Sequence, residues 1–328
     1  MRRHRALIGG LLLALLGLAT SASAERVTVR DKLGRMVTLR VPVQRAVLYE
    51  TYELLPVTGA WDRVAGLSRY ARDNDLLQAV NPDAVRAIPS VGSALDMNAE
   101  ALLRLQPDVV VTWTSDARAV RFLEARGVPV LAVYPESLAE LYDVMRLQGT
   151  LFGATPKVEA VIQQMDALFA AVGAATASRS GASRKTALWL YGKPTTVAGR
   201  LNLVQDLFAR MGLDNAAGAL SSRNIEVSLE QILRWNPAVL FIWGSARYGA
   251  AELVANTQWR AVRAVHDRAV FKAPTWSSWS PRLAPVALWM AASAYPDAFA
   301  GTDVPERIDR FSREVYGIPY AKGSQIAH

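Results

Sequence analysis

The segment between residues 276 and 282 combines side chains that bind small molecules. It reads Trp-Ser-Ser-Trp-Ser-Pro-Arg, with two indole rings among hydroxyls and a guanidinium at its end. Tryptophan offers a flat contact surface with one N–H donor, and arginine binds carboxylate-like groups through paired hydrogen bonds. Because the segment follows an expected strand at 269–272, we expect it to form a loop. The candidate ligand contacts in it are Trp276, Ser277, Ser278, Trp279 and Arg282.

Further candidates stand where other expected strands end. In an open α/β sheet, ligands bind beyond the carboxyl ends of the strands, since loops and helix N-termini converge there. Core packing is the alternative for each aromatic residue, and an ordinary surface position is the alternative for each cation. Glu50, which follows the first buried strand, would be unfavourable beside an anionic ligand. The candidates are Tyr49, Thr51, Tyr52, Tyr70, Ser93 and Trp113 in the first half of the chain and Lys193, Arg223 and Trp243 in the second.

Metal and cofactor chemistry finds little support in the composition. A bare transition metal needs clustered imidazoles and carboxylates. The chain has no cysteine, and only His266 and His328 remain once the first residues are removed. We therefore predict no metal site and no cofactor. For haem, an axial tyrosine would have to replace histidine. Among the nine tryptophans, those expected in the core are Trp61, Trp189, Trp259 and Trp289.

Enzyme signatures are missing from the sequence. It contains no Gly-x-Ser-x-Gly elbow, no Gly-x4-Gly-Lys loop, no Gly-x-Gly-x2-Gly turn and no Cys–His pair. We therefore predict a binding protein, with a hydrolase or chelatase-type enzyme as the remote alternative. A colour change on ligand binding without turnover would separate the two classes.

An internal repeat indicates the elements that position the candidate residues. Glu-x6-Pro-x5-Trp occurs from Glu100 to Trp113 and again from Glu230 to Trp243. Each copy predicts a short helix with a polar cap, at Asn98 or Ser228, that stops before proline and leads into an apolar strand. A strand that is apolar on both faces belongs in a covered, mostly parallel sheet. The repeat therefore predicts two similar α/β lobes.

Strands and helices alternate in both halves of the chain, around one long helix. After an entry hairpin over 26–41, the alternation predicts an N-terminal α/β lobe over 25–155. Its expected elements include strands at 64–67, 109–113 and 130–133 and a helix at 138–152. Thr155 and Pro156 are typical of a cap and a first helical residue, and they start a linking helix over 156–178. The alternation resumes in a C-terminal α/β lobe over 179–328. A single helix between the lobes implies a stiff hinge.

The first 24 residues are typical of an export signal. A basic start is followed by the apolar run 6–19, and Ala22-Ser23-Ala24 matches a signal peptidase site, so we expect cleavage after Ala24. The apolar run is short for a membrane span. Since no cysteine follows the site for a lipid anchor, we predict a periplasmic protein of a two-membrane bacterium.

The charge balance argues against a nucleic-acid partner. Cleavage removes three of the 37 basic residues, which leaves 34 against 29 acidic residues and a net charge of +5. The basic residues are dispersed, so we expect no nucleic-acid binding and regard a small anionic ligand as the more natural partner.

Several motifs in this order and spacing resemble one family. They include Gln44-Arg45-Ala46-Val47, Ile88-Pro89-Ser90-Val91-Gly92-Ser93, Leu105-Gln106-Pro107-Asp108-Val109-Val110, Val227-Ser228-Leu229-Glu230 and Tyr295-Pro296-Asp297-Ala298-Phe299. Over nearly all of the chain beyond residue 24, the sequence resembles the periplasmic substrate-binding proteins of bacterial transporters for iron complexes and cobalamin. The resemblance implies the helical-backbone (class III) fold of that family, which is also chelatase-like.

The resemblance also implies a function and partners. It implies a monomeric carrier that captures one ligand between its lobes and delivers it to the permease of an ABC transporter in the inner membrane. Glu100 and Glu230 match the family's permease-docking glutamates; their alternative is the favourable position of a carboxylate at a helix N-terminus. We expect an iron complex such as a ferric siderophore, with molybdate or tungstate and cobalamin as alternatives, and little closure on binding.

Overall fold

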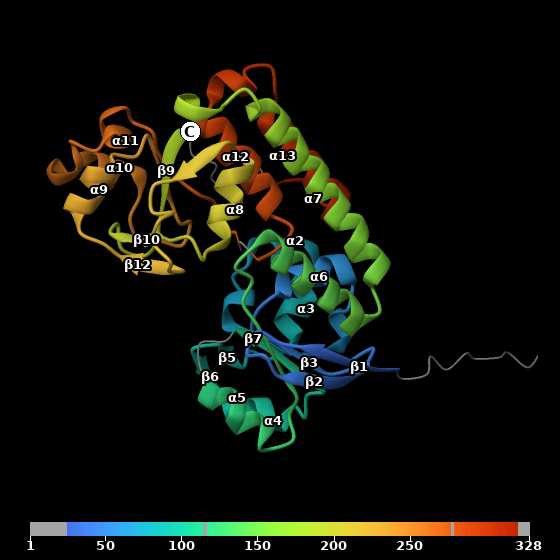
Figure 1. Cartoon of the computed structure of the whole chain (residues 1–328). Helices are drawn as coiled ribbons and strands as arrows, with labels where there is room; N and C mark the ends of the chain where they lie inside the picture. Colours follow the sequence, from blue (N-terminus) through green and yellow to red (C-terminus); the bar gives the residue numbers. More distant parts are fainter. Residues whose placement is uncertain (1–24, 114–116, 277–278, 321–328) are drawn as a thin grey trace, which may run out of the picture.

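The computed structural model describes residues 25–113, 117–276 and 279–320, and shows two α/β lobes along one helix (Figure 1). The expected signal peptide, Ser277 and Ser278 lie outside the described residues. Helix α7 (Thr155–Thr176) runs along one side of the molecule and connects the lobes. The architecture is the helical-backbone α/β fold that the sequence resemblance implies.

The N-terminal lobe is built on a parallel four-stranded sheet with the order β4-β3-β7-β8. The central strand β7 carries Val-Val-Val-Thr-Trp, and its first four residues are buried because apolar clusters cover both faces of the sheet. The strands of the sheet are β3 (Ala46–Leu48), β4 (Val64–Leu67), β7 (Val109–Trp113) and β8 (Val130–Val133).

Helices and two small hairpins surround this sheet. The antiparallel hairpin of β1 and β2 was expected from the sequence, whereas the short hairpin of β5 and β6 and the helices α2 and α3 were not. The hairpin strands are β1 (Glu25–Arg30), β2 (Met36–Val41), β5 (Gly92–Ser93) and β6 (Asp96–Met97). The helices are α1 (Leu55–Thr58), α2 (Asp75–Val80), α3 (Pro82–Ala87), α4 (Ala99–Arg104), α5 (Ala117–Glu124) and α6 (Leu138–Phe152).

The C-terminal lobe has a mixed six-stranded sheet. Strand β9 pairs in parallel with β11 and with β13, and β13 pairs in parallel with β14. Strands β10 and β12 add an antiparallel edge beside β9 that the sequence pattern did not predict. The strands are β9 (Lys185–Leu190), β10 (Thr196–Ala198), β11 (Leu213–Asn215), β12 (Asn224–Glu226), β13 (Val239–Ile242) and β14 (Val270–Lys272). The helices are α8 (Leu203–Arg210), α9 (Leu229–Trp235), α10 (Ala250–Ala255), α11 (Arg263–His266), α12 (Leu283–Ala294) and α13 (Val304–Tyr316).

The repeated sequence unit forms the same structure in each lobe. Helix α4 precedes β7, and α9 precedes β13. The predicted caps are confirmed, since the side chain of Asn98 accepts a hydrogen bond from Ala101 N and that of Ser228 accepts one from Gln231 N. The unit therefore places equivalent strand ends in both lobes.

Helix α7 is the longest in the part of the chain that the structure describes, at 22 residues. By length and composition it is apolar enough to cross a membrane, but its buried residues pack with the core helices α6 and α12. The predicted cap is wrong by one position, because Thr155 is already helical and Ala154 occupies the cap without a side-chain hydrogen bond.

Candidate functional site

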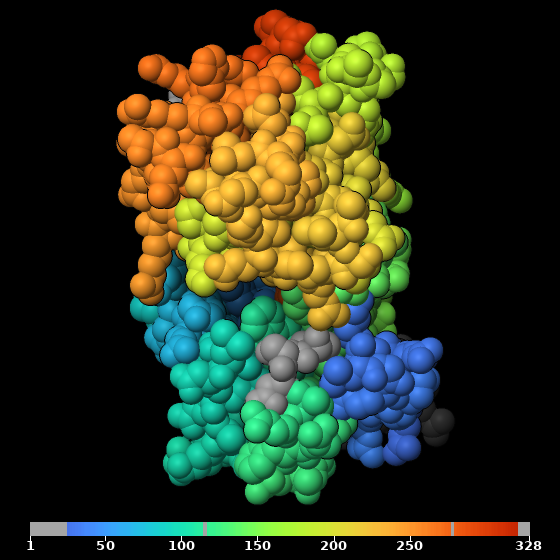
Figure 2. All heavy atoms as spheres, turned by 60° about the vertical axis from the view of Figure 1, so that its left-hand side comes forward, coloured from blue at the N-terminus to red at the C-terminus, as the bar shows by residue number. Residues whose placement is uncertain are grey.

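A groove separates the two lobes, and the strand ends of the N-terminal sheet lead to it. Figure 2 shows the groove between the yellow and orange C-terminal lobe and the cyan and green part of the N-terminal lobe. Leu48 of β3 pairs with Val111 of β7, and Trp113 of β7 pairs with Val133 of β8. The three parallel strands therefore end at the same edge of the sheet. Glu50, Trp113 and Tyr134 therefore stand next to one another at that edge.

Aromatic rings from both lobes meet there. The ring centroids of Tyr134 and Trp279 are 4.8 Å apart with the planes at 73°, and those of Trp113 and Tyr134 are 6.3 Å apart and stacked. Trp113 and Trp279 are 6.5 Å apart. The Nε1 of Trp113 is buried without a hydrogen-bond partner. We call these three residues the aromatic cluster; Trp279 contributes to it from the C-terminal lobe.

The C-terminal lobe adds a second aromatic pair at its own strand ends. Leu190 of β9 pairs with Ile242 of β13, so Tyr191 and Trp243 follow side by side, with ring centroids 6.0 Å apart. Trp243 is 38% exposed, unusual for a large indole that packs in a core. Burial raises the pKa of Tyr191 against the lowering effect of its hydrogen bond with Asn202, and Tyr134 of the other lobe makes a smaller contribution that also raises it. The two aromatic groups thus belong to one region.

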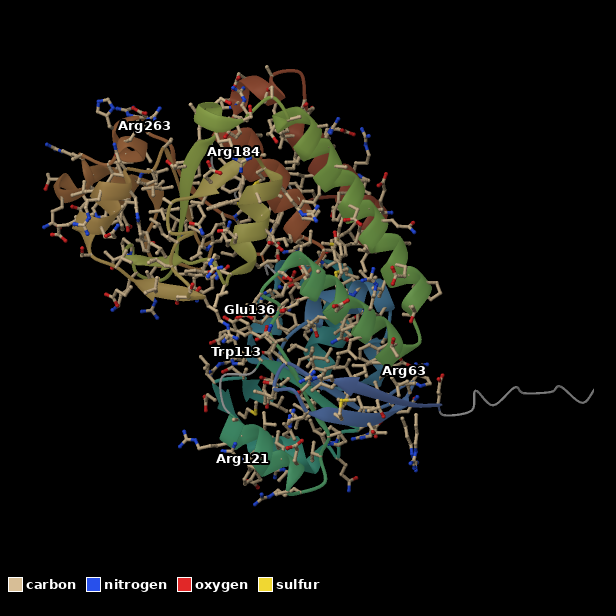
Figure 3. All side chains as sticks on the ribbon, viewed as in Figure 1. Arg63, Trp113, Arg121, Glu136, Arg184 and Arg263 are labelled. Atoms are coloured by element: carbon tan, nitrogen blue, oxygen red, sulfur yellow. The ribbon has the colours of Figure 1, made fainter. Side chains whose placement is uncertain are left out.

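Charged residues bridge the lobes beside the aromatic cluster. The Nε of Arg223 donates to the carboxylate of Glu136, whose other oxygen lies 2.9 Å from Lys32 Nζ. Partial burial of Glu136 disfavours its ionised form, but the hydrogen bonds from Arg223 and Lys32 outweigh this and lower its pKa. The guanidinium carbon of Arg223 lies 4.4 Å from the centre of the Tyr134 ring. Figure 3 shows Glu136 at the junction of the lobes, close to Trp113.

Glu50 is the least expected group at this edge. Burial first, and the negative charge of Glu53 second, raise the pKa of Glu50 to about 8. At neutral pH the carboxyl group is mostly protonated and can donate a hydrogen bond. This removes the objection that the Glu50 side chain would repel an anionic ligand.

Several sequence candidates lie in the interior instead of the groove. Tyr49, 1% exposed, donates its hydroxyl to Val91 O, and Ser93, also 1% exposed, accepts from Arg69. Thr51 is 5% exposed, and its hydroxyl donates to Glu50 O while it accepts from Gln148. These three predictions are corrected: their polar groups complete the lobe's internal hydrogen bonds, so they do not face the groove.

Arg282 is also buried, and its charge is satisfied between the lobes. Its Nη1 lies 2.7 Å from Asp75 Oδ1 of α2, and its Nε lies 4.0 Å from Glu53. Burial opposes its charge, but the two carboxylates hold its pKa above the usual value. The guanidinium also lies 5.1 Å from the centre of the Trp276 ring. Arg282 therefore lies between the lobes with two carboxylates beside it, and its predicted contact with the ligand stays a prediction.

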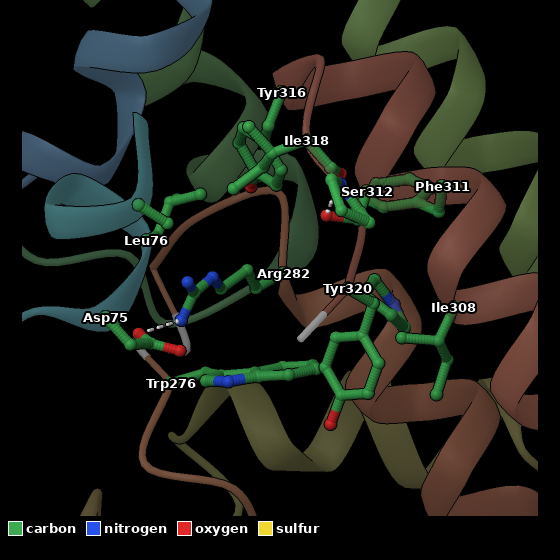
Figure 4. A pocket seen from close by; sticks show the side chains of 13 residues that line it. Asp75, Leu76, Trp276, Arg282, Ile308, Phe311, Ser312, Tyr316, Ile318 and Tyr320 are labelled. Carbon is green, nitrogen blue, oxygen red and sulfur yellow. Dashed lines mark hydrogen bonds and ion pairs between the residues drawn. The ribbon is translucent and has the colours of Figure 1, made fainter. Parts of the chain in front are cut away.

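Trp276 and Arg282 line a cavity away from the aromatic cluster. The cavity has a volume of about 280 Å³ and lies among α2, the start of α12 and α13 (Figure 4). Its walls are mostly apolar, and Tyr320 meets the Trp276 ring edge-on with the ring centroids 5.5 Å apart. The predicted Trp-Ser-Ser-Trp-Ser-Pro-Arg loop is therefore divided: Trp279 faces the groove, whereas Trp276 faces this cavity.

The other candidates take varied positions. Tyr52 is partly buried against the N-terminal core, and Tyr70 is 58% exposed. Lys193 pairs with Glu226 at 2.9 Å on the surface. Of the tryptophans expected in the core, Trp61 is partly buried, and the fully buried ones are Trp189, Trp259 and Trp289.

Three residues of the site were missed by sequence reasoning. Tyr134 follows the predicted strand 130–133, so the same strand-end rule would have selected it. No strand-end rule selects Glu136 or Lys32. Lys32 lies in the turn between β1 and β2, about a hundred residues before Glu136, and only the folded lobe brings the two together. Among the described residues, no group of three metal-binding side chains occurs.

Comparisons with known proteins agree with this architecture. The family model described as "Periplasmic binding protein" matches residues 46–275. The molybdate-binding protein MolA of Haemophilus influenzae is 25% identical and spans 94% of this chain and 97% of its own length. The vitamin B12-binding protein of Salmonella typhimurium is 25% identical over 50% of this chain and 62% of its own.

Solved structures show the same fold. CeuE of Helicobacter pylori in a Ni–His complex has a TM-score of 0.80 and 24% identity, covering 90% of this chain and 97% of its own. MolA of Haemophilus influenzae bound to molybdate has a TM-score of 0.77 and 20% identity, covering 90% of this chain and 99% of its own.

Proposed function

The chain belongs to the periplasmic binding protein family, the solute-binding components of ABC transporters, and on that premise we propose that it captures a metal complex of an organic chelator, such as a ferric siderophore. The observation that carries this proposal is the meeting of aromatic rings from both lobes in one groove. Flat rings bind the organic shell of a chelate by stacking and apolar contact. A chelated metal needs no ligand set from the protein.

The arrangement of the rings supports binding between the lobes. Trp113 and Tyr134 form a stacked wall on the N-terminal lobe, and Trp279 meets them from the C-terminal lobe, where the exposed Trp243 follows β13. A chelate in the groove would replace the contact between Tyr134 and Trp279. Binding would therefore exchange ring–ring contacts for ring–ligand contacts while the lobes keep their connection through α7.

Molybdate or tungstate is the second candidate, favoured by the hydrogen-bond donors of the site. An oxyanion offers only acceptors, and the groove offers two donors, the guanidinium of Arg223 and the protonated carboxyl of Glu50. Likeness to MolA along nearly the whole chain supports the same candidate.

We propose that Glu100 and Glu230 are the residues that contact the permease. They occupy equivalent positions in the first turns of α4 and α9, one on each lobe. The side chain of Glu100 is 81% exposed, with Arg104 3.4 Å away as its local partner. Such carboxylates can exchange a weak local ion pair for arginines of a partner.

The proposed location and state follow from the same premise. We propose that the signal peptide is cleaved after Ala24 and that the mature chain acts as a monomer in the periplasm. Mass spectrometry of the exported protein tests the cleavage site, and light scattering tests the monomer.

Calorimetric titration of the mature protein tests the ligand assignment. The panel contains a ferric hydroxamate, a ferric catecholate, nickel–histidine, haem, cobalamin, molybdate and tungstate. We expect heat of binding with one of the metal chelates, and Trp113→Phe to weaken it about 2- to 12-fold, the loss expected for one aromatic contact. Trp61→Phe, in the N-terminal lobe away from the groove, is the matched control. Binding of molybdate or tungstate alone would favour the second candidate, and no response to the whole panel would reject both.

A further inference from the structure

Arg223 is held over the N-terminal lobe although it belongs to the C-terminal lobe. It lies just before β12, and its side chain is 45% exposed. Its Nε donates to Glu136, and its guanidinium lies on the Tyr134 ring at 4.4 Å. Among the described residues, Nε alone makes hydrogen bonds from this side chain, so the two terminal NH₂ groups stay available to a solute.

Glu136 is itself firmly placed. It precedes α6, where Ser137 Oγ accepts from Glu140 N at 3.1 Å and the Glu140 carboxylate accepts from Glu136 N at 2.9 Å. Lys32 lies 2.9 Å from Glu136 and 2.6 Å from Glu140. The helix start and the lysine thus fix the carboxylate from its own lobe before Arg223 reaches it.

We propose that Glu136 is a positioning residue that draws Arg223 across the groove and lays it on Tyr134. One wall of the solute site is then built from both lobes, and it exists only while the lobes are close. The hydrogen bond from Leu138 N to Asp206 Oδ2, at 2.9 Å, joins the lobes two residues further along. In the empty protein, the Glu136–Arg223 pair keeps the groove narrow and the guanidinium oriented.

The Glu136–Arg223 ion pair can break and re-form as the groove between the lobes opens and closes. Its half-exposed guanidinium makes it a weak and salt-sensitive contact, unlike the buried Arg282–Asp75 pair. Loss of Glu136 should therefore loosen the groove without unfolding a lobe. This inference depends on one part of the proposed function, namely that the solute binds in the groove.

Distance measurements between the lobes test the proposal without a ligand. The chain has no cysteine, so spin labels can be placed at Leu95 and Leu201, which are 70% and 45% exposed on opposite lobes. We expect Glu136→Gln to shift the distances toward longer values at low salt, and 0.5 M salt to shift the parent protein likewise. Arg223→Gln should have the same effect, and the double variant should add nothing.

The control is Glu306→Gln, which removes an exposed carboxylate that pairs with Arg310 on α13 and has no contact with Glu136 or Arg223. It should leave the distances as in the parent protein. Identical distances in Glu136→Gln and the parent, or additive effects in the double variant, would overturn the proposal. Thermal unfolding of each variant confirms that the lobes stay folded.

Stopped-flow kinetics with a ferric hydroxamate and with molybdate as probes connect the pair to binding. We expect Glu136→Gln to raise the dissociation rate of the bound probe about 2- to 5-fold, the effect of one exposed ion pair. An unchanged rate for a probe that does bind would contradict the positioning role. If the parent protein binds neither probe, the proposed function is rejected for these two solutes. The interlobe distances still test the role of the Glu136–Arg223 pair.

Discussion

Replacement of Arg282 by methionine should be the most destabilising charge removal in the interlobe region. Arg282 is 7% exposed, and its guanidinium stands between Asp75 and Glu53, which is itself 2% exposed. Methionine fills much of the same volume but leaves the Glu53 carboxylate beside Asn74, a neutral donor at 2.7 Å, without the neighbouring cation. Breaking a buried ion pair from one side costs about 3 to 5 kcal/mol.

Asp75→Asn should cost less, because Asp75 is half-exposed. Its side chain is 47% exposed, so water already screens part of the attraction, and Glu53 remains near Arg282. We expect about 1 to 2 kcal/mol, between a hydrogen bond to a charged group and an exposed ion pair. Glu306→Gln, which breaks an exposed pair with Arg310 one turn along α13, is the matched control and should cost under about 0.5 kcal/mol.

Urea unfolding of the mature protein measures these differences as shifts of the midpoint at constant slope. The expected order of destabilisation is Arg282→Met, then Asp75→Asn, then Glu306→Gln. If Arg282→Met unfolds at the same urea concentration as Glu306→Gln, the reasoning from burial is refuted. A changed slope would show that the lobes unfold separately, and each transition would then be fitted by itself.

The remaining predictions concern pH, docking and stacking. Glu50 has a pKa of about 8 in the folded protein against 4.5 when unfolded, so the folded state holds this proton more tightly. The free energy of unfolding should fall as the pH rises from about 4.5 to 8, by at most about 1.4 kcal/mol per unit, and Glu50→Gln should flatten this slope in urea titrations. Joint replacement of Glu100 and Glu230 by alanine should abolish uptake and leave solute affinity unchanged in calorimetry, whereas weaker binding would place them at the solute. Trp243→Ala should weaken chelate binding about 2- to 12-fold, and unchanged affinity would remove the exposed ring from the site.

Local sequence signals predicted most of the regular elements. Strands at 64–67, 109–113 and 130–133 and the helix at 138–152 have the predicted bounds, because apolar runs and helix caps are local properties. The edge strands β10 and β12 were missed: each has only three residues and acquires its conformation by antiparallel pairing. Short elements of this kind depend on contacts that no local pattern contains.

The sequence by itself determined the two repeated α/β units, the helix between them and the strand ends at which aromatic residues gather. These follow from periodicity, capping and the direction of parallel strands. Only the tertiary structure decided which polar side chains face the groove. Arg282 and Arg223 are chemically alike, yet Arg282 is buried between Asp75 and Glu53, whereas Arg223 lies at the groove on Tyr134. Their difference arises from the partners that each meets across the lobes, and such long-range pairing is fixed by how the lobes pack together.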